Sequence, residues 1–348
     1  MSLGAQWTFA AEAPTTNKQT LTRDPNGNGT FSVYVRDVRI DAAPEEKARI
    51  YAPSRDFGKS MVTDGLYPLV IVLPGFLAHF SYYEQMTKHL VSWGFVVLGI
   101  DFAKPSDHVA SAKQVQKTID WALSRANPTF NIIDPEKIAV AGHSLGGKIA
   151  VYASSGDTNP KFAQLNFAGD PRIKLIIAWD PVDSGGPPCP IADGDLPGQC
   201  RGFPVLQGNI QRSRAKMLIF GGITDEPKSF TCTPAGRTHA NFFANATTSA
   251  LHVEFPKSGH VDWLDQDTWF GFLPFLGNLF CGDLFLGNLF SSHITRADPL
   301  QVQAVARRTQ LIWLLKNFGY YEDLDQYLTG EVIRAECSKH DLCRVEAK

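Results

Sequence analysis

KIAVAGHSLGG, residues 137–147, is the stretch of sequence that decides the fold. Its apolar first half predicts a buried strand, and the residues that follow Gly147 have the pattern of a helix. Between them, residues 142–146 match G-x-S-x-G in the strand-then-helix context of a nucleophile elbow. Such a turn projects the Ser144 hydroxyl above the sheet, at a helix N-terminus whose free N–H groups favour an oxyanion. The alternative is an ordinary turn with a capping serine.

Strands and helices alternate around this elbow, which predicts a mainly parallel sheet covered by helices on both faces. Nearly continuous apolar runs, typical of strands buried on both sides, occupy residues 67–73 and 95–100. Further strands are expected at 174–179, 216–220 and 251–255, and helices at 82–93, 111–126 and 300–318. Two leading strands with no helix between them, 32–40 and 48–52, predict an antiparallel start. Together these features predict an α/β-hydrolase fold.

The predicted organisation is a single domain of residues 31–330, between an N-terminal extension of residues 1–30 and a C-terminal tail of residues 331–348. Insertions are expected at about 184–212 and 266–298. The second insertion contains WFGFLPFLGNLFCGDLFLGNLF, residues 269–290, in which FLGNLF occurs twice. This apolar segment either packs over the core or forms a lid or a peripheral membrane contact.

Composition limits the classes of partner. Of the 348 residues, 44% are hydrophobic and 20% charged, and the formal charge is −2, so nothing indicates a nucleic-acid partner. No apolar run reaches the ~18 residues of a membrane span, and the polar N-terminus lacks the apolar core of a secretory signal. Six cysteines permit disulfides, with Cys189–Cys200 and Cys337–Cys343 as expected pairs, which would imply an oxidising compartment. The alternative is six unrelated buried thiols.

A serine nucleophile needs a general base, and His260 is the expected one. It follows the strand 251–255, and Gly259 before it permits the tight turn that aims a side chain over the sheet. In this fold the chain order is serine, acid, histidine. Other histidines are less well placed, because His252 lies inside the strand and His239 precedes it.

The acid has more than one candidate. Asp180 ends the strand 174–179, and Asp225 follows the next strand, 216–220. In the α/β-hydrolase fold, the geometry favours an acid that follows the later of these two strands. That residue is Asp225. Asp183 is a third option, and two aspartates after His260 are expected to be structural caps: Asp262 and Asp265.

The remaining expectations concern the oxyanion and the substrate. An oxyanion hole needs two donors, and these are expected to be the backbone N–H groups of Leu145 and Phe76. Leu77, His143 and Trp263 are expected to contact substrate. No phosphate loop, zinc motif or dinucleotide fingerprint is present, so no cofactor or metal is expected.

Several of these segments together resemble the chlorophyllases. The resemblance runs, in order, through residues 73–77 (LPGFL), 142–148 (GHSLGGK), 179–183 (WDPVD) and 259–265 (GHVDWLD). It implies hydrolysis of the phytyl ester of chlorophyll to chlorophyllide and phytol, without a cofactor. It also implies Ser144 and His260 in the roles above and Asp180 as the acid. Because the strand argument favours Asp225, both aspartates remain candidates for the acid.

The resemblance further implies a chloroplast or thylakoid location, for which the apolar segment 269–290 would be suited. A secretory or extracellular location is the alternative if disulfides form. The sequence departs from the higher-plant members at Leu145, where these usually carry Arg. A lipase, cutinase or polyester hydrolase is therefore the second hypothesis for function, and a non-catalytic hydrolase-fold binding protein is the third.

Overall fold

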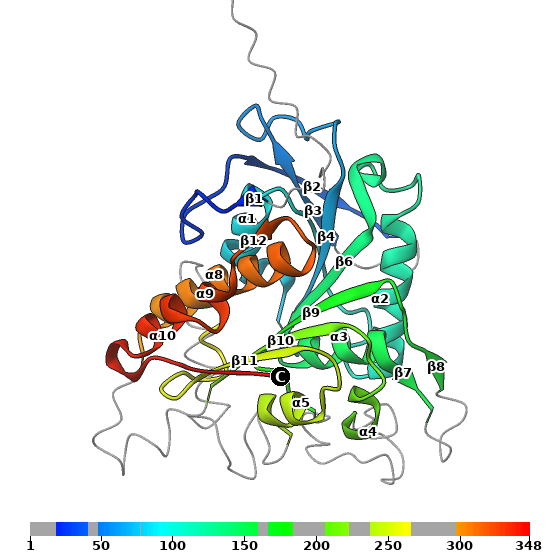
Figure 1. The fold of residues 1–348 in the computed structure, drawn as a ribbon. Helices are drawn as coiled ribbons and strands as arrows, with labels where there is room; N and C mark the ends of the chain where they lie inside the picture. The colour runs from blue at the N-terminus through cyan, green and yellow to red at the C-terminus, as the bar shows by residue number, and fades with distance from the viewer. Residues whose placement is uncertain are drawn as a thin grey trace, which may run out of the picture.

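The computed structural model describes residues 19–40, 48–76, 78–158, 166–183, 206–222, 237–265 and 297–348. Within them a nine-stranded sheet crosses the molecule (Figure 1). Its strands are β2 (Ser32–Val38), β3 (Ala48–Ser54), β4 (Tyr67–Leu73), β5 (Val96–Ile100), β6 (Ile133–His143), β9 (Ile173–Trp179), β10 (Lys216–Gly222), β11 (Ala250–Phe255) and β13 (Arg344–Ala347). Two short pairs stand apart: β1 (Gln19–Thr20) with β12 (Tyr321–Glu322), and β7 (Gly156–Asp157) with β8 (Phe167–Ala168).

The strand order is β13-β11-β10-β9-β6-β4-β5-β3-β2. The six strands from β11 to β5 run parallel, whereas β2 and β3 form the expected antiparallel start. At the other edge β13 pairs antiparallel with β11, so that Leu251 lies opposite Ala347. Within residues 331–348, the predicted C-terminal tail, β13 is therefore part of the sheet. Sequence pattern missed this because a four-residue, mostly exposed edge strand has no clear apolar alternation.

Helices cover both faces of the sheet (Figure 1). One face carries α2 (His108–Ala122), α3 (Leu145–Ser155), α4 (Gln207–Ile210) and α5 (His239–Asn245). The other carries α1 (Glu84–Ser92), α8 (Pro299–Asn317), α9 (Asp325–Leu328) and α10 (Glu331–Cys337). Three short 3-10 helices complete the described chain: η1 (Phe80–Tyr83), η2 (Phe130–Ile132) and η5 (Lys339–Asp341).

Two hydrophobic cores result, one on each face. In β4, Leu69, Ile71 and Leu73 pack with the helices α2 and α3, while Val70 and Val72 pack with α1 and α8. A strand buried on both sides has no polar face, which is why the central strands read as continuous apolar runs. The predicted α/β-hydrolase fold, a mainly parallel sheet between two layers of helices, is confirmed.

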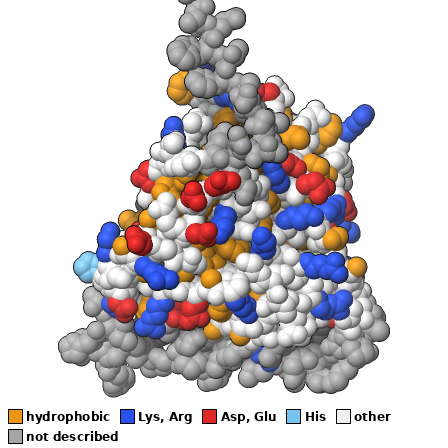
Figure 2. Space-filling model, in the orientation of Figure 1, with side chains coloured by type: hydrophobic (Ala, Val, Ile, Leu, Met, Phe, Trp, Pro, Cys, Tyr) orange, Lys and Arg blue, Asp and Glu red, His pale blue; other side chains and the backbone are white. Residues whose placement is uncertain are grey.

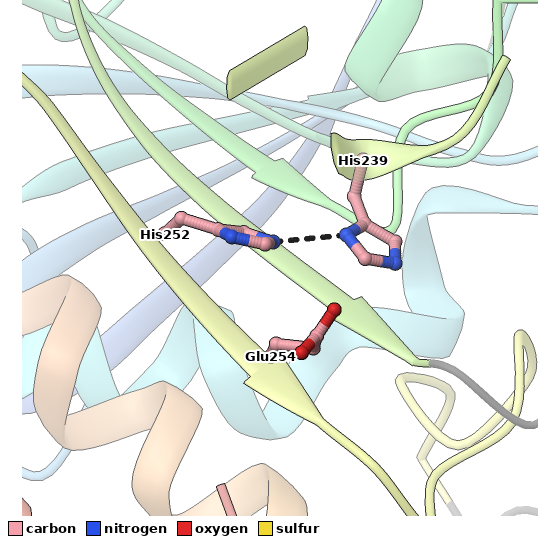
Figure 3. A group of neighbouring side chains, drawn as sticks. All are labelled: His239, His252 and Glu254. Carbon is pink, nitrogen blue, oxygen red and sulfur yellow. Dashed lines mark hydrogen bonds between the residues drawn. The ribbon is translucent and has the colours of Figure 1, made fainter. Parts of the chain in front are cut away.

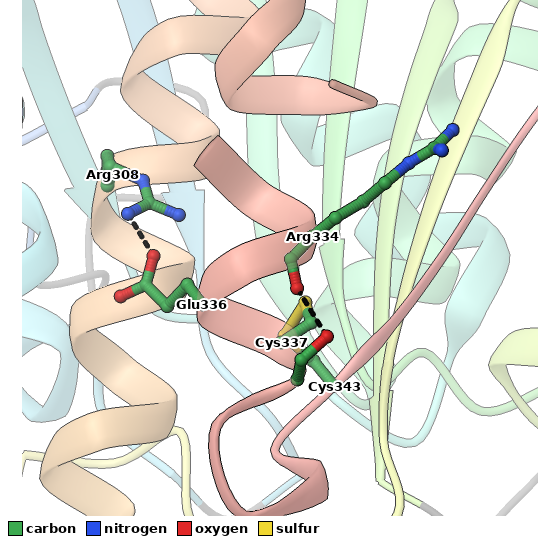
Figure 4. Close-up of a disulfide and its surroundings, with 6 residues drawn as sticks. Arg308, Arg334, Glu336, Cys337 and Cys343 are labelled. Atoms are coloured by element: carbon green, nitrogen blue, oxygen red, sulfur yellow. Dashed lines mark hydrogen bonds and ion pairs between the residues drawn. A yellow bond between two sulfur atoms is a disulfide. The ribbon is translucent and has the colours of Figure 1, made fainter. Parts of the chain in front are cut away.

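Helix α8 corresponds to the helix predicted at residues 300–318, but it is buried on more than one side. Its polar residues Gln303 and Arg308 are buried with the apolar ones, and each has a partner in another part of the chain. The Gln303 amide donates to the carbonyl oxygens of Asp262 and Leu264 at 2.8 and 2.6 Å. Arg308 forms an ion pair with Glu336 of α10 (Figure 4).

The predicted Cys337–Cys343 disulfide is formed and ties the end of α10 to the start of β13 (Figure 4). The other expected pair, Cys189–Cys200, lies outside the described residues, as does the apolar segment 269–290. Among the helices that the structure describes, none is both long and apolar enough to span a membrane.

Glycines allow α3 to begin directly on the ends of β4 and β6. A Cβ atom added to Gly146 would lie 2.5 Å from the carbonyl oxygen of Leu73. One added to Gly142 would lie 2.3 Å from the backbone carbon of Gly146. Both distances are far below a normal contact, so the turn around Ser144 closes only with glycine at both positions.

We therefore expect Gly146→Ala to lower the free energy of unfolding by about 1–3 kcal/mol, the usual cost of overpacking a closed site. Urea denaturation of the wild type and the variant measures this difference. Gly208→Ala is the matched control, because the added methyl group would meet nothing within 4 Å and alanine favours the helix. Equal stability of the two variants would contradict the packing argument.

Candidate active site

Ser144 sits in the turn between β6 and α3 with φ of 54° and ψ of −115°. This backbone conformation is unusual for a residue with a side chain and costs on the order of 1–3 kcal/mol. The backbone holds it in place, since Ser144 N–H donates to Trp179 O at 2.9 Å and Lys148 N–H donates to Ser144 O at 3.1 Å. The strained turn leaves the serine side chain partly exposed at the end of the sheet, as the elbow motif predicts.

His260 lies in the loop after β11, and that loop is held by Asp262. The Asp262 carboxylate accepts hydrogen bonds from Gly259 N–H at 2.7 Å and from Ser258 Oγ at 3.1 Å. The resulting turn places His260 Nε2 2.8 Å from Ser144 Oγ. Asp262 is thus a structural cap, as expected, and so is Asp265, which accepts from the Gln85 N–H at 3.0 Å near the start of α1.

Asp180 is the candidate acid whose carboxylate contacts His260. It follows β9 with a φ of 46°, and its Oδ2 atom lies 2.6 Å from His260 Nδ1. Its other oxygen accepts from the Gly222 N–H at 3.3 Å, and the side chain is completely buried. Asp225, the alternative candidate, lies outside the described residues.

The charge of Asp180 follows from these contacts. Burial by itself would raise the pKa of its carboxyl group, but the hydrogen bond from His260 and the neighbouring imidazoles outweigh it, so the net pKa is lowered. A carboxylate can only accept, so His260 Nδ1 carries the proton and donates it to Asp180. His260 Nε2 is then a lone-pair acceptor aimed at the Ser144 hydroxyl, which is the arrangement that a general base needs.

The loop after β4 passes close to Ser144. A Cβ atom added to Gly75 would lie 3.0 Å from His143 Nδ1 and 3.5 Å from Ser144 Cβ. Phe76 follows Gly75 directly, and its side chain is partly exposed. Leu145 is the first residue of α3, so its N–H has no acceptor within the helix.

A buried chain of hydrogen bonds connects the loop after β4 to the loop of His260. Gly75 N–H donates to Tyr83 Oη at 3.1 Å, and the Tyr83 hydroxyl donates to His143 Nδ1 at 2.9 Å. His143 Nε2–H then donates to the backbone oxygen of His260 at 2.7 Å. Because a carbonyl oxygen only accepts, this bond fixes the tautomer of His143.

His143 therefore holds the loop of His260. Burial, followed by the positive charge of a protonated His260, lowers the pKa of His143 to about 3, so its ring is neutral at pH 7. We expected His143 to contact substrate, but the side chain is buried between Tyr83 and His260 and both of its nitrogens are engaged.

Asp183, the second aspartate of Asp-Pro-Val-Asp, does not reach His260. It forms a fully buried ion pair with Lys148 of α3, with Nζ and Oδ1 separated by 3.3 Å. Its two oxygens also accept from the Leu206 N–H at 2.9 Å each. Because Lys148 follows the elbow by one turn of helix, this pair anchors α3 beneath the serine.

Trp263 and Leu77 were also predicted to contact the substrate. The Trp263 ring is fully buried against Phe220 and Phe255, with ring centroids 5.7 Å apart in both cases. The structure therefore gives Trp263 a packing position in the core and not the substrate contact that we expected. Leu77 lies outside the described residues.

Tyr83, Lys148 and Gly222 support the site and were not predicted. Tyr83 gave no sequence signal, because a single tyrosine in a predicted helix reads as an ordinary packing residue. Within the described ranges, one group of side chains could hold a metal ion. It consists of His239, His252 and Glu254, and it includes none of Ser144, His260 and Asp180.

Comparisons with known proteins show which family the chain resembles. The chlorophyllase family model matches residues 26–283. Chlorophyllase-2 of Arabidopsis thaliana is 26% identical over 239 residues, which cover 65% of this chain and 69% of that protein. Chlorophyllase-1 of the same plant is 22% identical over 260 residues, covering 72% and 74%. Cutinase est1 of Thermobifida alba is 31% identical over a shorter stretch of 123 residues, covering 34% and 39%.

The fold and these relatives define an ester hydrolase, whose substrate is a small-molecule ester. Because the family model matches well over half of the sequence, the chain belongs to the chlorophyllase family.

The depressed pKa of His143 makes a prediction about stability. With a pKa of about 3 when folded and about 6.5 when unfolded, this imidazole binds a proton only on unfolding between those values. Its contribution to stability is present above pH 6.5 and is lost as the pH falls toward 3. We expect His143→Gln to reduce the acid-side slope of unfolding free energy by about 1.4 kcal/mol per pH unit.

Urea denaturation at a series of pH values measures this slope. Other buried histidines remain in the variant, such as His89 with a pKa lowered to about 4 by burial, so part of the slope is retained. His340→Asn is the control, because His340 is exposed and Asn tolerates its positive φ. Identical slopes in the wild type and His143→Gln would refute the neutral, buried assignment.

Proposed function

We propose that this protein hydrolyses a carboxylic ester through an acyl-enzyme on Ser144, with His260 as general base and Asp180 as the acid of the triad. The observation that carries the proposal is the pair of hydrogen bonds on one imidazole, 2.8 Å to Ser144 Oγ and 2.6 Å to Asp180 Oδ2. Serine, aspartate and histidine, in this order along the chain, are also typical of the fold.

The first half of the reaction forms the acyl-enzyme. Ser144 Oγ attacks the ester carbonyl carbon while its proton passes to His260 Nε2. The resulting imidazolium is stabilised by Asp180, which stays ionised. The tetrahedral intermediate then collapses, the bond to the alkoxy oxygen breaks, and His260 returns the proton to the departing alcohol.

Water completes the cycle. His260 takes a proton from a water molecule that attacks the acyl carbon, and the acid is released as Ser144 Oγ regains its proton. In both halves the oxyanion is assigned to the N–H groups of Leu145 and Phe76. Supporting this assignment, Leu145 begins α3, and Gly75, next to Phe76, lies against Ser144. Loss of one such donor costs on the order of 10²–10³ in kcat.

Chlorophyll is the proposed substrate, with chlorophyllide and phytol as products. Membership of the chlorophyllase family supports it, and the apolar segment 269–290 would suit a phytyl tail or a thylakoid surface. On the same grounds we propose a chloroplast location. The Cys337–Cys343 disulfide makes an oxidising, secretory location the alternative.

A cutinase-like activity on polyesters is the second candidate. It is favoured by the local identity to Cutinase est1, 31% over 123 residues, and by 34% identity over 86 residues to the bis(hydroxyethyl) terephthalate hydrolase of Streptomyces coelicolor. A non-catalytic binding protein is disfavoured, because selection for binding alone would not keep an imidazole hydrogen-bonded to both Ser144 and Asp180.

We expect Ser144→Ala to abolish ester hydrolysis and Asp180→Asn to lower kcat by about 10⁴, the usual effect of forcing the wrong histidine tautomer. Initial rates on p-nitrophenyl butyrate measure both losses. Asp323→Asn is the control, since Asp323 is exposed and is expected to keep full activity. Appreciable turnover by Ser144→Ala, with circular dichroism showing a folded protein, would overturn the nucleophile assignment.

For the substrate, we expect the wild type to release chlorophyllide from chlorophyll, with a higher kcat/KM than on triglycerides or a terephthalate ester. Chromatographic separation of the pigments measures the product, and Ser144→Ala provides the blank. Deleting residues 269–290 should lower activity on chlorophyll more than on p-nitrophenyl butyrate. Rapid cleavage of terephthalate esters with no chlorophyllide would favour the cutinase-like alternative.

A further inference from the structure

Two histidines and a glutamate meet at the junction of α5 with β11 (Figure 3). His239 is the first residue of α5. His252 and Glu254 are two residues apart on β11, so their side chains leave the same face of the sheet. His239 Nδ1 and His252 Nε2 are 2.9 Å apart, and one ligand atom from each of the three residues lies within 4.8 Å of the other two.

The ring of His239 lies against the backbone of Gly221. A Cβ atom added to Gly221 of β10 would lie 2.0 Å from the His239 ring, so the ring occupies the space that glycine leaves. The ring of His252 is stacked on Phe243 of α5, with centroids 5.1 Å apart. Both imidazoles are buried, with exposures of 0% for His239 and 5% for His252, and their orientations are fixed by packing.

Hydrogen bonding within the group is incomplete. Two imidazole nitrogens that face one another at 2.9 Å can share one proton at most. The remaining nitrogen of His239, Nε2, is buried with no hydrogen-bond partner in the described part of the chain. Burying an imidazole that is only partly satisfied is costly. An ion between the two rings would use the lone pairs of both facing nitrogens, with no proton needed between them.

We propose that His239, His252 and Glu254 bind a divalent transition-metal ion of the Zn²⁺ type. Imidazole nitrogen and carboxylate oxygen are ligands that Zn²⁺ accepts, with bonds of about 2.0–2.1 Å that place neighbouring ligand nitrogens about 3.0–3.4 Å apart. The histidine spacing needs only a small outward shift to meet this. Ca²⁺ and Mg²⁺ prefer all-oxygen sites, so the two imidazoles select against them.

Arg344 competes with the ion for the carboxylate of Glu254. Arg344 Nη1 of β13 lies 3.9 Å from Glu254 Oε2, and this ion pair is weak because it is long and its arginine is exposed. The ion would cross-link α5 to β11. Through His239 it would also brace Gly221, the neighbour of Gly222, whose N–H is donated to Asp180.

Titration with Co²⁺ tests the site directly, because ligand-field bands in the visible spectrum report its coordination without reference to activity. We expect one Co²⁺ per chain, displaced by Zn²⁺, and a higher melting temperature with Zn²⁺ than with EDTA. His239→Asn and Glu254→Gln should each weaken Zn²⁺ binding by about 100-fold or more, since loss of an outer-shell partner alone costs about 10–100-fold.

Matched controls separate this site from binding elsewhere. Glu136→Gln and His340→Asn remove an exposed carboxylate and an exposed imidazole and should bind Zn²⁺ as the wild type does. Circular dichroism in EDTA shows whether each variant folds, and Glu254→Gln keeps the side-chain shape. No ligand-field band in the wild type, or equal Zn²⁺ affinity in Glu254→Gln and Glu136→Gln, would overturn the proposal and leave a histidine pair joined by a hydrogen bond.

Discussion

The hydrogen bond between Asp180 and His260 is the interaction on which the rest of the site depends. It joins residues 80 positions apart in the chain at 2.6 Å, which requires β9 and β11 to end at the same edge of the sheet. It also fixes which nitrogen of His260 carries the proton, and therefore which nitrogen faces Ser144. An exposed bond of this kind would be weakened by water, but Asp180 is completely buried.

Several buried contacts hold the side chains of Ser144, His260 and Asp180 in position. Asp262 holds the turn before His260, His143 holds its backbone oxygen, and the Lys148–Asp183 ion pair fixes α3 below Ser144. Removing one partner of a buried ion pair costs about 3–5 kcal/mol, so this layer stabilises the fold as well as the site. The loop after β4 belongs to the same layer, because Gly75 is joined to His143 through Tyr83.

Much of this could be read from the sequence, and the exceptions have physical reasons. The G-x-S-x-G turn and the position of His260 follow from local pattern, since glycines and a strand end impose them. The choice of Asp180 did not follow from strand order. It came from the resemblance to the chlorophyllases, and the geometry then placed Asp180 against His260. The contacts of Tyr83 and His143 could not be predicted, because they depend on how distant elements pack. Trp263 was misread because its place in the motif says nothing about which way the ring points.

The central claim is that Ser144 is a nucleophile activated by His260. A fluorophosphonate probe measures this most directly, because it reacts covalently only with an activated serine, and peptide mapping identifies the labelled residue. We expect one label per chain, on Ser144, with labelling at least about 10²-fold slower in His260→Gln, the smallest effect usual for loss of a general base. Labelling at another residue, or labelling of Ser144 at the same rate without His260, would contradict the account.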